Sequence, residues 1–335
     1  MSPGPQARRL FVLAILGLAL LHAGCGGGDG NQGIQGNRTD GQTRATLVLD
    51  YVPNAVHAGI YRAIAAGYYE DEGIDLEVRT PSSTSDTARL LLAGRAEFGL
   101  LDGLDLGEQV SEGRPVRAVM AVLRRPAGGL VTLADSGVRT PADLAGRKVG
   151  ETGAPSDRAV FQTMVESAGG DPAASEVVSI GFGGVQARVA GRIAAFTGYL
   201  PADSTAVESK GYPARSVAFA RWGGPPYPGR VVATEQTTVR ERPGLVRGFI
   251  RATERGYRDA LADPKWAVAD LAAGADGVDT AFALKAFEAY RPLIGPTEGV
   301  GRITPGPVRG LSRFMVDSGL TERRFGPARF GLSLP

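Results

Sequence analysis

One short segment of the chain carries four side chains that suit the binding of a small ring. In "LDYVPNAVHAG", Asp50, Tyr51, Asn54 and His57 offer a carboxylate, an aromatic face, an amide and an imidazole. We expect His57 to be neutral, because a helix N-terminus disfavours imidazolium, and a neutral imidazole donates one hydrogen bond and accepts another. Tyr61 follows four residues later and shares the helical face of His57. This set suits recognition of a small nitrogen heterocycle.

A strand, a loop and a helix are needed to bring these side chains together. "TLVLDY" at 46–51 is an apolar run that is typical of a buried parallel strand. Pro53 favours an extended residue before it, Asn54 is a good N-cap, and 57–70 has helical spacing. Because ligands of parallel α/β sheets bind at the carboxyl ends of strands, we place these four residues in a binding cleft.

The alternation of strands and helices continues along the chain and is interrupted at two Gly/Pro clusters, "PAGG" at 126–129 and "WGGPPYPG" at 222–229. About 290 residues follow the predicted leader and tether, more than one core comfortably supports. The pattern therefore predicts an α/β protein with two lobes, mainly parallel sheets and two crossings between the lobes. The first lobe would comprise 45–127 plus 231–335, and the second 128–230.

The N-terminal segment predicts export. Residues 1–24 contain Arg8 and Arg9, an apolar run too short to span a bilayer, and small residues ahead of Cys25, as in a signal peptide. The lone Cys25 resembles the acylated cysteine of bacterial lipoproteins, although His22 stands where an aliphatic residue is usual. The alternative is ordinary secretion with a free thiol. Residues 25–44 are nearly free of apolar side chains and predict a flexible tether.

Composition argues against several other classes of function. Without Arg8 and Arg9 the chain has 35 basic and 35 acidic side chains, a balance that leaves no electrostatic footprint for nucleic acid. "GFGGV" at 181–185 lacks the third glycine of a dinucleotide motif, and no phosphate-binding P-loop or nucleophile elbow is present. One histidine after the leader and no cysteine beyond Cys25 argue against zinc. We therefore predict no metal, no cofactor and no enzymatic activity.

Residues 49–78 resemble the signature of substrate-binding proteins of ABC importers. "LDYVPNAVHAGIYRAIAAGYYEDEGIDLEV" is similar to the family's L-D-W-x-P-N-x-x-H-x-G-x-Y pattern, and "LLAGRAEFGLLDG", "TPADLAGRKVGETGAPSD" and "GPPYPGRVVAT" extend the resemblance over roughly 45–320. The matching branch carries thiamine pyrimidine precursors and is related to the fungal thiamine-pyrimidine synthase. The resemblance implies a bilobal fold of the periplasmic-binding-protein type II kind, which closes around its ligand.

The resemblance also implies roles for individual residues. Tyr51 takes the place of the family's Trp and would stack on the ligand, while Asn54 and His57 match the motif's Asn and His. From the other lobe, Tyr199 and Asp203 in "AAFTGYLPADSTAVE" align with the family's acidic segment. That segment departs from the pattern, because Ile193-Ala194-Ala195 stands where an acid is usual and Asp203 is shorter than the family's Glu.

Three further residues have two interpretations each. Asp102 follows "FGLL" and either faces the cleft or only caps the next helix. Glu151 lies between a strand and a helix, where N–H groups can hold an anion, but Ser156 there is equally an N-cap. Tyr227 lies between prolines and either lines the cleft or stiffens the crossing.

Together these observations predict a monomeric solute-binding lipoprotein on the extracytoplasmic side of the membrane. It would be anchored through Cys25 and would deliver a small heterocycle, such as a thiamine pyrimidine precursor, to an ABC permease. The alternatives are the same class of protein carrying riboflavin, a sulfonate or another organic anion, and a pyrimidine-synthase-like enzyme. In the synthase the motif's His is consumed as a source of the pyrimidine, but that enzyme also carries a cysteine-rich iron motif, which this chain lacks.

Overall fold

The computed structural model of the protein describes residues 41–331. The predicted signal peptide, Cys25 and most of the predicted tether lie outside this range. Strand β1 begins at Thr43, so the last two residues of the predicted tether belong to a strand. Among the described residues, no helix is both long and apolar enough to cross a membrane.

The first sheet contains five strands in the order β2-β1-β3-β10-β4. Their bounds are β1 Thr43–Val48, β2 Ile74–Arg79, β3 Phe98–Leu101, β4 Val116–Leu123 and β10 Arg230–Glu235. β1 pairs with β2 and β3 in parallel, whereas β10 runs antiparallel to β3 and β4. This sheet and its helices form what we call the first lobe.

The second sheet repeats this order with β7-β6-β8-β5-β9. Its strands are β5 Gly128–Leu133, β6 Lys148–Glu151, β7 Glu176–Ser179, β8 Ala195–Tyr199 and β9 Ala214–Ala218. β6 pairs with β7 and β8 in parallel, and β5 runs antiparallel to β8 and β9. This sheet and its helices form the second lobe. Both sheets are thus mixed, which corrects the prediction of mainly parallel sheets.

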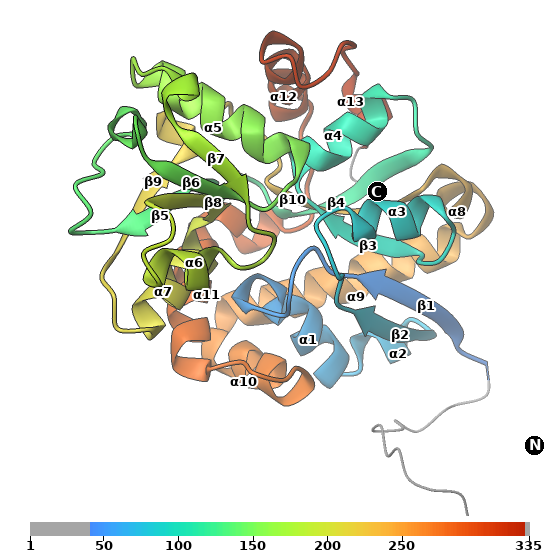
Figure 1. Ribbon diagram of the computed structural model, residues 1–335. Coiled ribbons are helices and arrows are strands. Elements are labelled where there is room, and N and C mark those ends of the chain that lie inside the picture. The colour runs from blue at the N-terminus through green and yellow to red at the C-terminus, as the bar shows by residue number, and fades with distance from the viewer. Residues whose placement is uncertain (1–40, 332–335) are drawn as a thin grey trace, which may run out of the picture. The chain divides into compact units, whose positions relative to one another are not determined.

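Helices cover both faces of the first sheet (Figure 1). On one face, α1 (Ala58–Ala65), α2 (Tyr68–Asp71), α9 (Pro243–Ala262) and α10 (Pro264–Gly274) pack against one another, and α11 (Thr280–Ile294) packs against α10. On the other face, α4 (Gly103–Ser111) contacts α12 (Pro305–Asp317) and α13 (Pro327–Phe330). Short helices α3 (Asp86–Leu92) and α8 (Gln236–Glu241) lie against β3 and β10, respectively.

The second lobe has fewer helices. They are α5 (Pro155–Ser167), α6 (Gly184–Val189) and α7 (Leu200–Ser209), with 3-10 turns at Pro141–Leu144, Pro172–Ala174 and Phe219–Arg221. Two further 3-10 turns, Ala55–His57 and Thr297–Gly299, belong to the first lobe. α7 contacts α11 and α5 contacts α4, so the two lobes touch through helices.

The chain crosses between the lobes twice, at 124–127 and at 222–229, at the predicted Gly/Pro clusters. The two crossings lie against each other, because a Cβ on Gly229 would meet the carbonyl oxygen of Arg125 at 2.3 Å. The carboxyl ends of β1, β3, β6 and β8, together with the first residue of the antiparallel β10, therefore face the space between the lobes.

Candidate functional site

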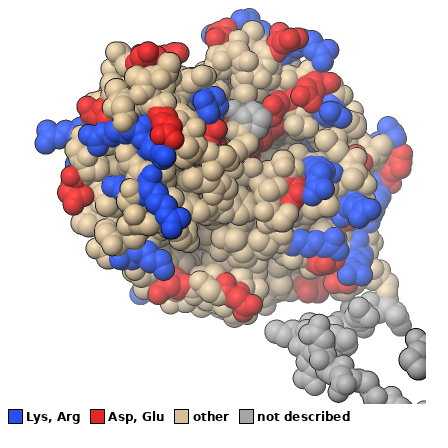
Figure 2. Space-filling view, viewed as in Figure 1, with Lys and Arg blue, Asp and Glu red and all other residues tan. Residues whose placement is uncertain are grey.

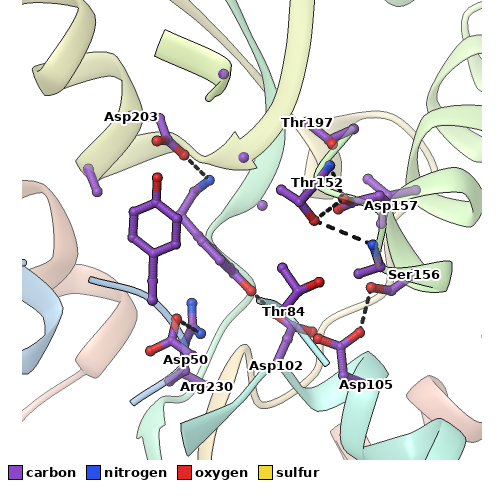
Figure 3. A pocket seen from close by; sticks show the side chains of 18 of the residues that line it. Asp50, Thr84, Asp102, Asp105, Thr152, Ser156, Asp157, Thr197, Asp203 and Arg230 are labelled. Atoms are coloured by element: carbon purple, nitrogen blue, oxygen red, sulfur yellow. Dashed lines mark hydrogen bonds and ion pairs between the residues drawn. The ribbon is translucent and has the colours of Figure 1, made fainter. Parts of the chain in front are cut away.

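A cavity of ≈ 100 Å³ lies between the two lobes. Its walls come from the loops that follow β1, β3, β6, β7 and β8 and from the start of β10. Figure 3 shows acidic side chains entering this space from both lobes. On the outer face drawn in Figure 2, basic and acidic side chains are interspersed. The cavity is thus richer in acidic side chains than the outer face in this view.

Asp50 and Arg230 form a buried ion pair on the first-lobe side of the cavity. The Arg230 side chain is 1% exposed, and its guanidinium carbon lies 4.0 Å from the ring centroid of Tyr199. Burial alone would raise the pKa of Asp50, but Arg230 and the hydrogen bond from His57 outweigh it and hold that pKa below its ordinary value. Asp50 is therefore ionised at neutral pH and neutralises Arg230. Arg230 Nε is buried and has no hydrogen-bond partner in the described part of the chain.

Four further carboxylates line the same cavity: Asp102, Asp105, Asp157 and Asp203. Asp102 caps α4 by accepting a hydrogen bond from Leu104 N–H at 2.9 Å. Asp203 accepts from the backbone N–H of Tyr199 at 2.7 Å. Burial raises the pKa of Asp157 to about 6 and that of Asp203 to about 7. Burial likewise raises the pKa values of Asp102 and Asp105, which lie close together and repel each other's charge.

The balance of charge in the cavity is therefore negative. One guanidinium faces five carboxylates, and Asp50 alone is enough to neutralise it. Because burial raises their pKa values, the remaining acids are only partly ionised at neutral pH; each can accept hydrogen bonds from a ligand and would ionise beside a positive charge on it.

Aromatic side chains cover another part of the wall. The rings of Tyr51 and Phe182 meet edge to face with centroids 4.4 Å apart, and Tyr51 Oη donates a hydrogen bond to the carbonyl oxygen of Phe182 at 3.2 Å. Tyr199, Tyr227 and Tyr290 also line the cavity. Burial raises the pKa of Tyr51, with Asp203 and Asp50 adding to the effect, so its hydroxyl stays protonated.

The family model described as NMT1/THI5 like matches residues 54–267. The chain belongs to the NMT1/THI5 like family.

Relatives of the chain are named for two different functions, binding and synthesis. A formylaminopyrimidine-binding protein of Halalkalibacterium halodurans is 31% identical over 219 residues, which cover 65% of this chain and 66% of that protein, just under two thirds. A 4-amino-5-hydroxymethyl-2-methylpyrimidine phosphate synthase of Legionella pneumophila is 26% identical over 259 residues, covering 76% of this chain and 81% of that protein. The family expected from residues 49–78 is confirmed.

Solved structures confirm the predicted fold. The periplasmic aliphatic sulphonate binding protein SsuA from Escherichia coli superposes with a TM-score of 0.68 at 13% identity, covering 87% of this chain and 92% of that one. At such low identity the likeness shows the fold alone, which is the bilobal fold of periplasmic binding proteins.

Seven of the ten residues predicted from the sequence as ligand contacts line the cavity. They are Asp50, Tyr51, Asn54, Asp102, Tyr199, Asp203 and Tyr227. For Asp102 both interpretations hold, since it caps α4 and faces the cavity. Asn54 accepts a hydrogen bond from Val56 N–H as the predicted N-cap.

His57 does not reach the cavity, which corrects the prediction of direct ligand contact. Its side chain is fully buried, its Nδ1 accepts a hydrogen bond from Asn54 N–H at 3.1 Å, and its Nε2 lies 2.9 Å from Asp50 Oδ1. Because Nδ1 faces a donor, the ring proton belongs on Nε2 and is donated to Asp50. In this family member His57 thus orients a carboxylate of the cavity wall.

Tyr61 and Glu151 also lie outside the cavity wall. Tyr61 is 8% exposed and packs against Gly274 of α10, where a Cβ would meet its ring at 2.6 Å. Glu151 forms a two-point contact with Arg158, at 3.1 Å for both hydrogen bonds. The carboxylate of Glu151 is therefore engaged by an arginine of its own lobe.

Several cavity residues were missed at the level of sequence. They are Arg230, Asp105, Asp157, Ser156, Thr152, Phe182 and Tyr290. A usable signal existed for Arg230, a charge that opens the apolar run "RVVAT", and for Phe182, an aromatic in the glycine-rich loop after a strand. Asp105 and Asp157 are each in the first turn of a helix, where acids are common for other reasons.

Proposed function

We propose that the protein is an extracytoplasmic solute-binding protein of an ABC importer, and that its ligand is a small amino-substituted heteroaromatic such as a thiamine pyrimidine precursor. The observation that carries this proposal is the charge of the interlobe cavity, in which four carboxylates remain beyond the Asp50–Arg230 pair. Carboxylates accept hydrogen bonds from amino groups and ring N–H groups, and they favour a protonated heterocycle. The name of the Halalkalibacterium relative supports the same ligand class.

Cavity size favours a single ring. An engineered cavity of about 150 Å³ in another protein holds benzene, and the cavity here measures ≈ 100 Å³. A three-ring flavin would require the lobes to move further apart than a single ring would. Tyr51 and Phe182 supply aromatic rings at the wall.

A sulfonate or another organic anion is the runner-up cargo, because the SsuA fold is shared. The excess of carboxylates opposes it, since an anion there would face acids on both sides. An enzyme resembling the synthase is the other alternative. The burial of His57 against Asp50 and Asn54 opposes that reading, because no substrate reaches its ring in this arrangement.

The proposed mechanism is closure of the lobes around the ligand, followed by delivery to a membrane permease, with no covalent step. Cys25 would carry the lipid anchor and hold the protein at the membrane. The protein would act as a monomer. Metal is not part of this mechanism, and in residues 41–331 no group of three or more His, Cys, Asp or Glu side chains is arranged to hold one.

The test is a thermal-shift and calorimetric screen of the purified protein against aminopyrimidines, thiamine, riboflavin, purines and sulfonates. A ligand at about a hundred times its Kd stabilises the native state by about 2.7 kcal/mol, which a melt detects. We expect aminopyrimidines to bind, Tyr51→Ala to weaken that binding, and Tyr212→Ala, an exposed tyrosine outside the cavity wall, to leave it unchanged. A shift with sulfonates alone would contradict the proposed cargo, and turnover of a pyrimidine would contradict the proposed class.

A further inference from the structure

A second cavity, of ≈ 400 Å³, lies where both crossings meet the C-terminal part of the chain. We call it the hinge pocket and define it by its lining residues. These are Arg124, Arg125, Pro226, Pro228, Arg291, Pro292, Leu293, Gly295, Pro296, Arg302, Thr304 and Pro307. It shares no lining residue with the interlobe cavity, and its polar character is opposite, with four arginines and no carboxylate.

Three of these arginines carry uncompensated charge. Arg291 pairs with Glu288 at 3.0 Å. For Arg124, Arg125 and Arg302, by contrast, the described part of the chain provides no carboxylate partner. Most other arginines that line a cavity here are paired, as Arg230 is with Asp50. The guanidinium groups around the hinge pocket repel one another unless an anion lies between them.

The fold holds Arg124 in position. Its backbone N–H donates to the carbonyl oxygen of Leu293 at 2.8 Å. A Cβ on Gly295 or Gly299 would lie 2.9 or 2.5 Å from its Nη1, so in this arrangement the guanidinium lies directly against both glycines. Gly295 also has φ +95°, which other residues rarely adopt. The guanidinium therefore lies beside the Gly295–Gly299 turn at the edge of the pocket.

The chemistry of the pocket selects its ligand. The planar guanidinium fork matches the oxygens of phosphate in two-point contacts, and arginine is weakly hydrated enough to give up water there. Three unpaired guanidinium groups call for an anion with two or more charges. We propose that the hinge pocket binds a small phosphate-bearing anion, a phosphate monoester or diphosphate, separately from the interlobe ligand.

Binding at this place has a consequence for the lobes. The pocket is lined by both crossings, through Arg124 and Arg125 on one and Pro226 and Pro228 on the other. An anion that contacts both would bind more tightly to one relative orientation of the lobes. By linkage it would then change the affinity of the interlobe cavity, and the interlobe ligand would change anion affinity by the same factor.

The experiment is a calorimetric titration of the purified protein with sodium diphosphate, with chloride added to keep ionic strength constant. We expect saturable binding that Arg125→Gln/Arg302→Gln weakens roughly tenfold or more, because two charge-assisted contacts are lost. Both residues are exposed, so this variant should fold normally. The matched control is Arg95→Gln/Arg192→Gln, two exposed arginines outside the pocket.

Further arms separate the sources of the anion and separate this site from the proposed cargo site. Glycerol phosphate represents a soluble phosphoester, and vesicles containing phosphatidylglycerol represent a lipid headgroup. Tyr51→Ala should bind diphosphate like the unaltered protein, whatever the interlobe ligand proves to be. Heat that does not saturate, or equal weakening in the control variant, or undiminished binding in Arg125→Gln/Arg302→Gln, would each overturn the proposal.

Discussion

Ionisation of the Asp203 side chain lowers the stability of the native state, although we propose that its carboxylate contributes to ligand binding. In the native protein burial raises its pKa to about 7 from the ordinary 3.8. Between these values the native state holds a proton that the unfolded chain has lost, so this group makes stability fall as pH rises from about 4 to about 7. Asn cannot ionise, and its side-chain oxygen can still accept the hydrogen bond from Tyr199 N–H. We therefore expect Asp203→Asn to match the unaltered protein at pH 4 and to be more stable at pH 7.5.

We expect a gain in unfolding free energy of about 1 kcal/mol or somewhat more. One pKa unit corresponds to about 1.4 kcal/mol, and the free energy that the whole shift would imply is reduced because Asp203 is partly exposed to solvent. This gain corresponds to a Tm higher by about 2–4 °C at pH 7.5. Melting curves across pH 4–8 measure it, while titration with an aminopyrimidine should show weaker binding. A variant that is less stable at pH 7.5 would mean that the carboxylate serves the fold, not the ligand.

Some residues of the site could be predicted from their position in the sequence, and others could not. Asp50, Tyr51 and Asn54 were predictable because they follow one strand directly. His57 was predictable as important but not in its role, since only the structure shows Nε2 turned toward Asp50. Arg230 was missed because its partner Asp50 is 180 residues away, a pairing that no local pattern encodes.

At the scale of elements, the contact of α1 with α9 depends on glycines. A Cβ on Gly256 of α9 would lie 2.0 Å from the carbonyl oxygen of Gly59 and 2.7 Å from the Cβ of Ala63. The helices would have to move apart, and such overpacking typically costs about 1–3 kcal/mol. We expect Gly256→Ala to lower the free energy of unfolding by about that amount, as measured by chemical denaturation.

The same helix supplies the control. Gly244, near the start of α9, has nothing within 4 Å of an added Cβ. Gly244→Ala should be neutral or slightly stabilising, because alanine is the better helix former by up to about 1 kcal/mol. If both substitutions had equal effects, helix propensity and not packing would explain them.

How far elements could be predicted depended on their neighbours in sequence. Within α9, apolar residues at intervals of four predict a buried face; Phe249, Thr253 and Tyr257 are fully buried, whereas Leu245 at the same spacing is only half-buried. Strands β5 and β9 were not predicted, because they adjoin the Gly/Pro clusters and look like parts of the crossings. They and β10 run antiparallel to their neighbours, and strand direction is a property of topology that an alternating pattern does not reveal.

At the scale of the whole molecule, the lobes are held together across the interlobe cavity by a few polar contacts. Ser156 Oγ of α5 donates to Asp105 Oδ1 of α4 at 2.6 Å, and Tyr199 Oη donates to Asp102 Oδ2 at 3.4 Å. At the rim, Lys285 of α11 pairs with Glu208 of α7. Chain length and the two Gly/Pro clusters predicted two lobes, but these contacts join segments far apart in sequence and were not predictable.

We expect Ser156→Ala to shift the ligand-free protein toward more open arrangements of the lobes. The substitution removes the Ser156–Asp105 hydrogen bond, which is shorter than the Tyr199–Asp102 bond. Part of the binding free energy must then be spent on closure, so the apparent Kd for the interlobe ligand should rise by about five- to tenfold. Small-angle scattering should give a larger radius of gyration without ligand, and saturating ligand should restore the value of the unaltered protein, since ligand selects the closed state. Ser175→Ala is the control, because Ser175 Oγ donates to Leu144 O within the second lobe at 2.9 Å. A Ser156→Ala protein with unchanged radius and unchanged Kd would show that this contact accompanies closure without contributing to it.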